Sequence, residues 1–179
     1  WSQLKTKRLI KKSFPKNSPD YDEPSMIDNK IKESNPIETF IIDWYYNWEK
    51  LKDSYDEIDE IMFNNQDCIF SGTAYRFIEL NKPSQKLNDL QDITNYVKSS
   101  IQDNSICSFS KSTAGAEYFA KEDYRTFGAI IESDIKGIDF VSLTTKYKMN
   151  TQLPNLNDEE EVIVIDPVYD FAIVAIIED

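Results

Sequence analysis

Four acidic residues run directly into four β-branched apolar residues between Asp158 and Ile165. The apolar half is typical of a buried strand, because β-branched side chains fit the packed surface of a sheet. Side chains alternate along a strand, so a strand that begins at about Glu159 places Glu159 and Glu161 on one face and Glu160 on the other. Close carboxylates suit chemistry in which positive charge develops. The alternative interpretation is an acidic strand entrance that faces water.

The composition of the chain limits its partners. Its 179 residues favour one domain with a core of its own. Twenty basic and 32 acidic residues give a net charge of −12, which argues against direct binding of duplex nucleic acid and favours a basic partner or plain solubility. We expect no membrane association, because no apolar run approaches the length of a membrane span.

The residue types limit the chemistry as well. The chain has no histidine, which excludes Ser-His-Asp and Cys-His catalysis and the usual zinc sites. Cys68 and Cys107 have neither metal-ligand spacing nor the pattern of a disulfide framework. We therefore expect a cytoplasmic protein without a metal, whose chemistry uses carboxylates, hydroxyls, Arg, Lys or Tyr.

The chain divides into an arm and one domain. Residues 1–33 form a basic, proline- and serine-rich arm, and residues 34–179 form the domain. The arm is either a loosely packed leader or a docking tail for an acidic surface. The domain begins with a helix, because Asn35 is a good cap, Pro36 fits the first turn and Glu38 can reach back to the cap. An apolar stripe with helical spacing follows as far as Leu51, and we assign it to the core.

Further helices and strands follow from their periodicity. A second helix opens at Ser54, and later helices are predicted over 88–101, 114–120 and 139–146. Strands are predicted over 68–70, 74–78, 105–110, 126–132, 159–165 and 171–177, with a turn or bulge at 71–73 and a break at Gly137. We expect the last strand to pair with Val162–Ile165 or to lie close to it. This order predicts an α+β fold with a mainly antiparallel, two-layer β core and helices on the N-terminal side.

Two other predicted strands carry polar residues. Arg76 lies inside an apolar strand, where a lone charge is costly, so it needs either a carboxylate of the fold or a ligand phosphate. Ser108-Phe109-Ser110 ends a strand that leads into a helix start, a place that can position polar ligand groups. Plain capping by Ser112 or Thr113 is the alternative interpretation of that helix start.

In this order and spacing, Arg76, Ser108-Phe109-Ser110 and Glu159-Glu160-Glu161 resemble the mono-ADP-ribosyltransferases of the Arg / Ser-x-Ser / Glu-x-Glu class. The likeness covers about Ile69 to Ile177 and is greatest to the small enzymes of T-even-like bacteriophages. Those enzymes share a Ser-aromatic-Ser/Thr strand and a following Ala..Phe-Ala helix, here Ala116–Ala120. The chain departs from the family pattern where Phe77 replaces a frequent glycine and where Phe109 replaces the middle hydroxyl.

The resemblance implies an ADP-ribosyltransferase-like fold and a reaction in which NAD is the substrate. ADP-ribose passes to an arginine of a target protein, and nicotinamide is released. Breaking the nicotinamide–ribose bond gives an oxocarbenium-like transition state, which needs a fixed carboxylate in a site that excludes water. Glu161 is our candidate, because it is the glutamate closer to the buried strand. The resemblance implies that Ser108 orients Glu161 and that Glu159 receives the acceptor guanidinium.

The remaining candidates bind NAD or the target. Arg76 is expected to grip the diphosphate or the adjoining ribose through its planar fork of donors. Phe109, Ser110 and Arg125 are further candidates for binding NAD. Tyr147 is a candidate for binding the target, because the family uses the segment before Glu-x-Glu for this purpose. For Arg125 and Tyr147 the alternative is an ordinary surface position.

Two other functions stay open. An NAD glycohydrolase would use water as the acceptor, and Glu159 argues against it because water needs no carboxylate for a guanidinium. A non-enzymatic module would bind other proteins through its acidic strand entrance and basic arm. For a transferase, the net charge favours a basic target, for example a nucleic-acid-associated host protein in the same cytoplasm. The sequence leaves open whether RNA rather than protein is the acceptor.

Overall fold

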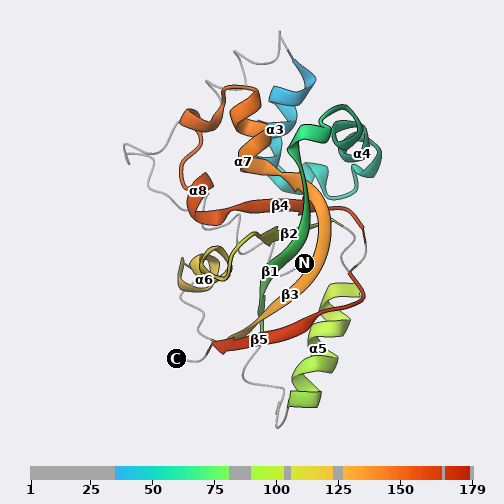
Figure 1. The fold of residues 1–179 in the computed structure, drawn as a ribbon, viewed down its shortest axis with the longest axis vertical. Coiled ribbons are helices and arrows are strands. Elements are labelled where there is room, and N and C mark those ends of the chain that lie inside the picture. Colours follow the sequence, from blue (N-terminus) through green and yellow to red (C-terminus); the bar gives the residue numbers. More distant parts are fainter. Residues whose placement is uncertain (1–34, 81–89, 103–105, 123–126, 167, 178–179) are drawn as a thin grey trace.

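The chain has an α+β fold in which helices come first and a five-stranded sheet follows (Figure 1). The computed structural model describes residues 35–80, 90–102, 106–122, 127–166 and 168–177. The arm predicted over 1–33 and Arg125 lie outside these residues. In the described part, no helix is both long enough and apolar enough to pass through a bilayer.

The first helix of the described chain begins where its cap was predicted. Helix α3 spans Pro36–Asn47, and the Asn35 side-chain oxygen accepts a hydrogen bond from the Ile37 backbone N–H at 3.1 Å. A short 3-10 helix, η1 (Trp48–Leu51), continues it. The apolar stripe is buried as expected, and its fully covered members are Phe40, Ile41, Trp44, Tyr45, Trp48 and Leu51. Helix α4 (Tyr55–Asn64) and η2 (Gln66–Cys68) then lead to the first strand.

The strand pairings of the described residues are all antiparallel, as predicted. The strands are β1 (Ile69–Glu79), β2 (Cys107–Ser110), β3 (Gly128–Asp139), β4 (Glu161–Val164) and β5 (Ala172–Ile177). β1 pairs with both β3 and β2, β2 pairs with β4, and β4 pairs with the end of β3. Four strands therefore close a ring, and β5 extends the sheet at the other end of β3.

Residues paired across a ladder share a face, so the whole ring has one inner and one outer face. Most inner-face residues are buried, among them Ala74, Ile78, Phe109, Ile131, Val162 and Val164. Helix α5 (Leu90–Gln102) adds Val97 and Ile101 to the same cluster. On the outer face, α6 (Thr113–Glu122) packs Ala116 and Ala120 against Phe77 and Ile130.

Several local predictions were wrong, and long-range pairing explains most of them. β1 is continuous through the turn predicted at 71–73, and β3 is continuous through Gly137. The two strands pair without a gap from Ile69↔Ile138 to Glu79↔Gly128, so ladder hydrogen bonds override the local preference of glycine. The last strand pairs with β3 rather than with β4. The helical spacing of residues 88–101 predicts that Leu90 faces inward with Ile93, Val97 and Ile101, but Leu90 is 63% exposed at the start of α5.

The second half of the chain places short helices around β4. Helix α7 (Phe140–Lys146) follows β3 directly, and the Asp139 carboxylate caps it by accepting from Ser142 N–H at 3.1 Å. A 3-10 turn, η3 (Asn150–Gln152), and the single-turn helix α8 (Leu156–Glu159) then carry the chain to β4. Figure 1 shows α3, α4 and α7 gathered at one end of the sheet, while α5 and β5 lie at the other end.

Gly137 allows β3 and β4 to approach closely. A Cβ built at this position would clash with the backbone oxygen and carbonyl carbon of Ile163. These are backbone atoms, so they cannot yield as a flexible side chain would. The glycine is therefore a packing requirement at the strand crossing and not a break in the strand.

Replacing Gly137 with alanine is expected to lower the free energy of unfolding by about 1–3 kcal/mol, the usual cost of overpacking. Urea denaturation followed by tryptophan fluorescence measures this change. Lys136→Ala is the matched control, because Lys136 is the exposed neighbour on the same strand. Equal stability of the two variants would contradict the close approach of β3 and β4.

Candidate functional site

Glu161 is the centre of a buried hydrogen-bonded group. It is the first residue of β4 and is 1% exposed. The Ser108 hydroxyl donates to its Oε1 at 2.6 Å, and the Trp44 indole N–H donates to the same oxygen at 3.1 Å. The bonded side chains come from β2, β4 and α3. The predicted pairing of Ser108 with Glu161 is therefore present in the structure.

The register of β2 and β4 explains why these two side chains meet. Ser110 lies opposite Glu161, and Ser108 lies opposite Ile163. Facing residues share a side of the ladder, so Ser108, Ser110 and Glu161 all lie on the outer face. Serine and glutamate two pair positions apart on adjacent strands are within reach of a diagonal hydrogen bond.

A left-handed residue sets the direction in which the chain enters β4. Glu160 has φ 45° and ψ 45°, and its N–H donates to the Leu156 carbonyl at 3.1 Å. Its own carbonyl accepts from the Lys111 backbone N–H at 3.0 Å, and its carboxylate accepts from the Ser112 hydroxyl. The Ser112 oxygen also accepts from Gly115 N–H at 3.1 Å, which confirms the predicted cap of α6. The start of α6 is thus tied to the turn before Glu161.

Glu159 does not occupy the predicted position. It was expected beside Glu161 on one strand face and nearer to solvent, but β4 begins only at Glu161. Glu159 ends α8 and is 2% exposed. The left-handed backbone at Glu160 separates the two glutamates, so strand alternation does not relate them. The alternative interpretation, an acidic strand entrance that faces water, is wrong for Glu159 and Glu161, because both side chains are buried.

Arg76 lies on the opposite side of the sheet from Ser108 and Glu161. Its neighbour Tyr75 pairs with Ser110, so Tyr75 shares the outer face and Arg76 points to the inner face. The guanidinium is 4% exposed and adjoins the Cys107 thiol. Among the described residues, neither Nη1 nor Nη2 of Arg76 has a hydrogen-bond partner. The structure therefore brings Ser108 and Glu161 together but does not bring Arg76 to them.

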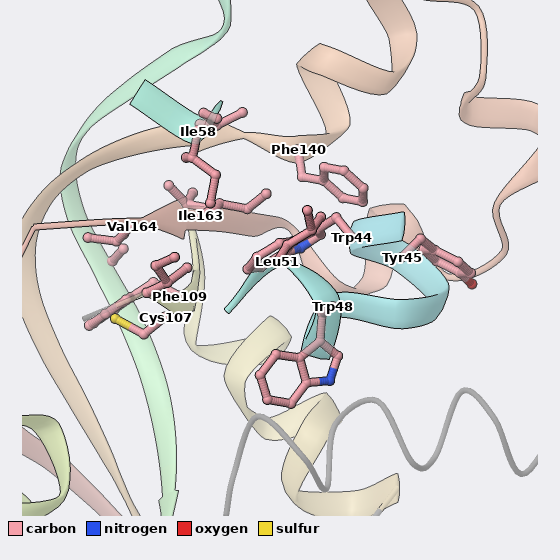
Figure 2. Close-up of a cluster of buried hydrophobic side chains, with 14 of the residues drawn as sticks. Trp44, Tyr45, Trp48, Leu51, Ile58, Cys107, Phe109, Phe140, Ile163 and Val164 are labelled. Carbon is pink, nitrogen blue, oxygen red and sulfur yellow. The ribbon is translucent and has the colours of Figure 1, made fainter. Parts of the chain in front are cut away.

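The other predicted residues have separate environments. Phe109 is buried on the inner face, within the apolar cluster drawn in Figure 2. Ser110 lies on the outer face beneath α6, where a Cβ at Gly115 would be 3.1 Å from its Oγ. The Tyr147 hydroxyl donates to the Asn65 side-chain oxygen at 2.8 Å and links the end of α7 to the end of α4. That contact gives Tyr147 a structural partner.

Sequence reasoning missed the polar role of Trp44. Its helical spacing assigned it to the core, and it is indeed 1% exposed. A buried indole N–H usually finds an acceptor, so the expected burial of this tryptophan was itself a signal that its N–H has a hydrogen-bond partner. The link between Ser112 and Glu160 was missed because only the structure places the start of α6 beside the turn before β4.

At least two hollows lie in the described part of the chain. One of about 270 Å³ adjoins α8, and its lining residues are Val141, Thr145, Asn150, Leu153, Asn155, Leu156, Asn157 and Asp158. The other, of about 450 Å³, lies where β1, β3 and β5 meet and is lined in part by Glu132, Asp134 and Asp170. No group of carboxylates and cysteines among the described residues is arranged to hold a metal ion.

Comparison of the chain with family models, with curated proteins and with solved structures found no match. The function is therefore inferred from the motifs and from the geometry around Glu161.

Replacing Arg76 with methionine is expected to raise the free energy of unfolding by about 1–4 kcal/mol, because a buried guanidinium whose two Nη atoms lack hydrogen-bond partners among the described residues is replaced by an apolar chain of similar length. Denaturation in urea at pH 7 measures the change. Arg76→Lys, which keeps a charge at this position, should not give the same gain. A marked loss of stability in Arg76→Met would show that the guanidinium is paired in solution.

The thiol of Cys107 gives a prediction about alkaline pH. Burial raises the pKa of Cys107, and the adjacent Arg76 guanidinium offsets part of this rise. An unfolded thiol loses its proton near pH 8.5, so above that pH stability should fall by about 1.4 kcal/mol per pH unit until the folded thiol also ionises. Cys107→Ala should remove this component of the slope, as measured by denaturation between pH 8 and 10. Identical slopes would contradict a raised pKa.

Proposed function

We propose that the protein is an NAD-dependent mono-ADP-ribosyltransferase that modifies arginine on a protein and releases nicotinamide. The observation that carries the proposal is the hydrogen bond of 2.6 Å from Ser108 to the buried carboxylate of Glu161. It joins the first serine of the Ser-x-Ser motif to the second glutamate of the Glu-x-Glu motif. These two motifs are separated by about fifty residues of sequence and resemble those of the transferases.

The proposed reaction needs a negative charge held beside the ribose. When the C1′–N bond breaks, nicotinamide leaves as a neutral molecule and the ribose carries positive charge. Glu161 would stabilise that charge, and Ser108 would hold the carboxylate in one orientation. Burial of Glu161 supports this role, because its field is weakly screened where water is excluded. A guanidinium nitrogen of the acceptor would then bond to C1′ and lose a proton.

The position of Arg76 changes its part in the proposal. Because Arg76 lies on the inner face next to Cys107, it would pack against β2 rather than bind the diphosphate of NAD. The dinucleotide would bind on the outer face, where Ser108, Ser110 and Glu161 are found. Because these side chains are buried beneath α3 and α6, one of these helices would have to move to admit it. Phe109, which shares the inner face, would serve as a packing residue.

The acceptor would approach from the side of α8. The hollow of about 270 Å³ there has amide and carboxylate side chains on its rim, from Asn150, Asn155, Asn157 and Asp158. These groups can accept hydrogen bonds from a guanidinium. The net charge of −12 adds a preference for a basic target protein in the same cytoplasm.

A second candidate function is NAD hydrolysis, and the burial of Glu159 favours it. At 2% exposure, Glu159 is not placed to receive a guanidinium from a large protein unless α8 moves. Water reaches such a position more easily than an arginine side chain does. Both candidate functions use Glu161 and Ser108 in the same way and differ only in the acceptor.

Glu161→Gln is expected to reduce nicotinamide release by at least about a hundredfold, the usual cost of removing a group that stabilises transition-state charge. The reaction is followed with labelled NAD, with and without a lysate, by measuring free nicotinamide and labelled protein. Asp166→Asn is the control, because Asp166 is an exposed acid just beyond the other end of β4.

The two candidate functions give different results in that assay. Label on protein supports transfer, and release of nicotinamide without lysate supports hydrolysis. A folded wild-type protein that neither cleaves NAD nor melts at a higher temperature in its presence would overturn both and favour a protein-binding module.

A further inference from the structure

The N-terminal helix supplies a polar contact to the candidate active site. Trp44 lies in the middle of α3, and its indole N–H donates to Oε1 of Glu161 across 117 positions of sequence. The ring is 1% exposed and packs against Phe40, with centroids 6.3 Å apart. The indole is therefore fixed by its surroundings before it contacts the carboxylate.

Two donors to Glu161 reach the same oxygen. The Ser108 hydroxyl and the Trp44 indole converge on Oε1. A hydroxyl can rotate about its C–O bond, whereas an indole N–H has one direction set by a rigid ring. Two donors from different elements hold the carboxylate plane more firmly than one does. Hydrogen bonds to an ionised acceptor also favour the charged form of the acid.

We propose that Trp44 is a positioning residue for Glu161, which holds the carboxylate in the orientation that the cleavage of NAD requires. This inference rests on the proposed function, because the orientation matters only if Glu161 acts on NAD. Trp44 itself does not touch the reacting atoms in this scheme. Its contribution passes through Oε1 of Glu161.

The neighbouring Trp48 provides a matched comparison. It belongs to the same helical stretch and is also buried. Figure 2 shows that the two indole rings point in different directions, and the indole N–H that donates to Glu161 is that of Trp44. Replacing either tryptophan with phenylalanine removes a similar volume from the core, so the difference between the two variants isolates the bond to Glu161.

The kinetic test compares Trp44→Phe with Trp48→Phe. In Trp44→Phe, kcat for nicotinamide release should fall about ten- to a hundredfold, as expected for losing a hydrogen bond to a charged group. KM for NAD should change less than about twofold, because binding of the ground state does not depend on this bond. The acidic limb of the pH–rate profile should move to higher pH, since the ionised carboxylate has lost a donor. Trp48→Phe should shift neither kcat nor the profile in this way.

A second measurement detects the bond without any activity. The chain has three tryptophans, so a ¹H–¹⁵N spectrum of indole-labelled protein contains few signals. The signal that Trp44→Phe removes belongs to Trp44. That signal should shift in Glu161→Gln, while the Trp48 signal should stay in place. If Trp44→Phe does not fold, the benzothiophene analogue of tryptophan at position 44 keeps the ring shape and removes the N–H.

The outcomes separate the inference from the function. The proposal would be overturned if the Trp44 signal did not shift in Glu161→Gln. It would also be overturned if Trp44→Phe kept the wild-type kcat and pH–rate profile. A Trp44 signal that responds in a protein without NAD cleavage would show that the proposed function has failed and that the bond is only structural. A responsive signal together with a selective loss of kcat in Trp44→Phe would support the proposal.

Discussion

The hydrogen bond between Ser108 and Glu161 depends on the register of two four-residue strands. β2 and β4 are short, and each pair from Cys107↔Val164 to Ser110↔Glu161 lies in the ladder. A shift by one residue would turn Glu161 to the inner face and replace it with Val162. The alternation of apolar residues on the inner face opposes such a shift, because it would bury a carboxylate beside Cys107 and Phe109 of β2. The packing of the core therefore fixes the position of the carboxylate.

The connections around this pair constrain it from both ends. Glu160 ties the entrance of β4 to the start of α6, and Lys111 at the end of β2 pairs with Asp139 at 2.8 Å, where α7 begins. The close crossing of β3 and β4 at Gly137 holds the far side of the strand. The group around Glu161 is thus held by backbone and side-chain contacts from several elements. Such support is what a preorganised site requires.

The sequence was sufficient for the features that depend on local periodicity and capping. The start of α3, the buried stripe along it and the α+β class with a mainly antiparallel sheet were predicted correctly, because Asn35 and the spacing of apolar residues are local signals. The bond from Ser108 to Glu161 was predicted through the resemblance of motifs. The positions of Glu159 and Arg76 could not be obtained in this way. The first depends on a left-handed residue at Glu160, and the second depends on which face of β1 meets the inside of a closed ring.

The contact from α3 to β4 has a consequence for how the protein is made. Trp44 and Glu161 are 117 positions apart, so a ribosome releases the helix long before it has synthesised the strand. Until β4 has emerged and paired with β2, the indole has no carboxylate to bind and the candidate site does not exist. A nascent chain that lacks its last strands cannot assemble the group around Glu161. β4 must therefore be synthesised before the candidate site can form.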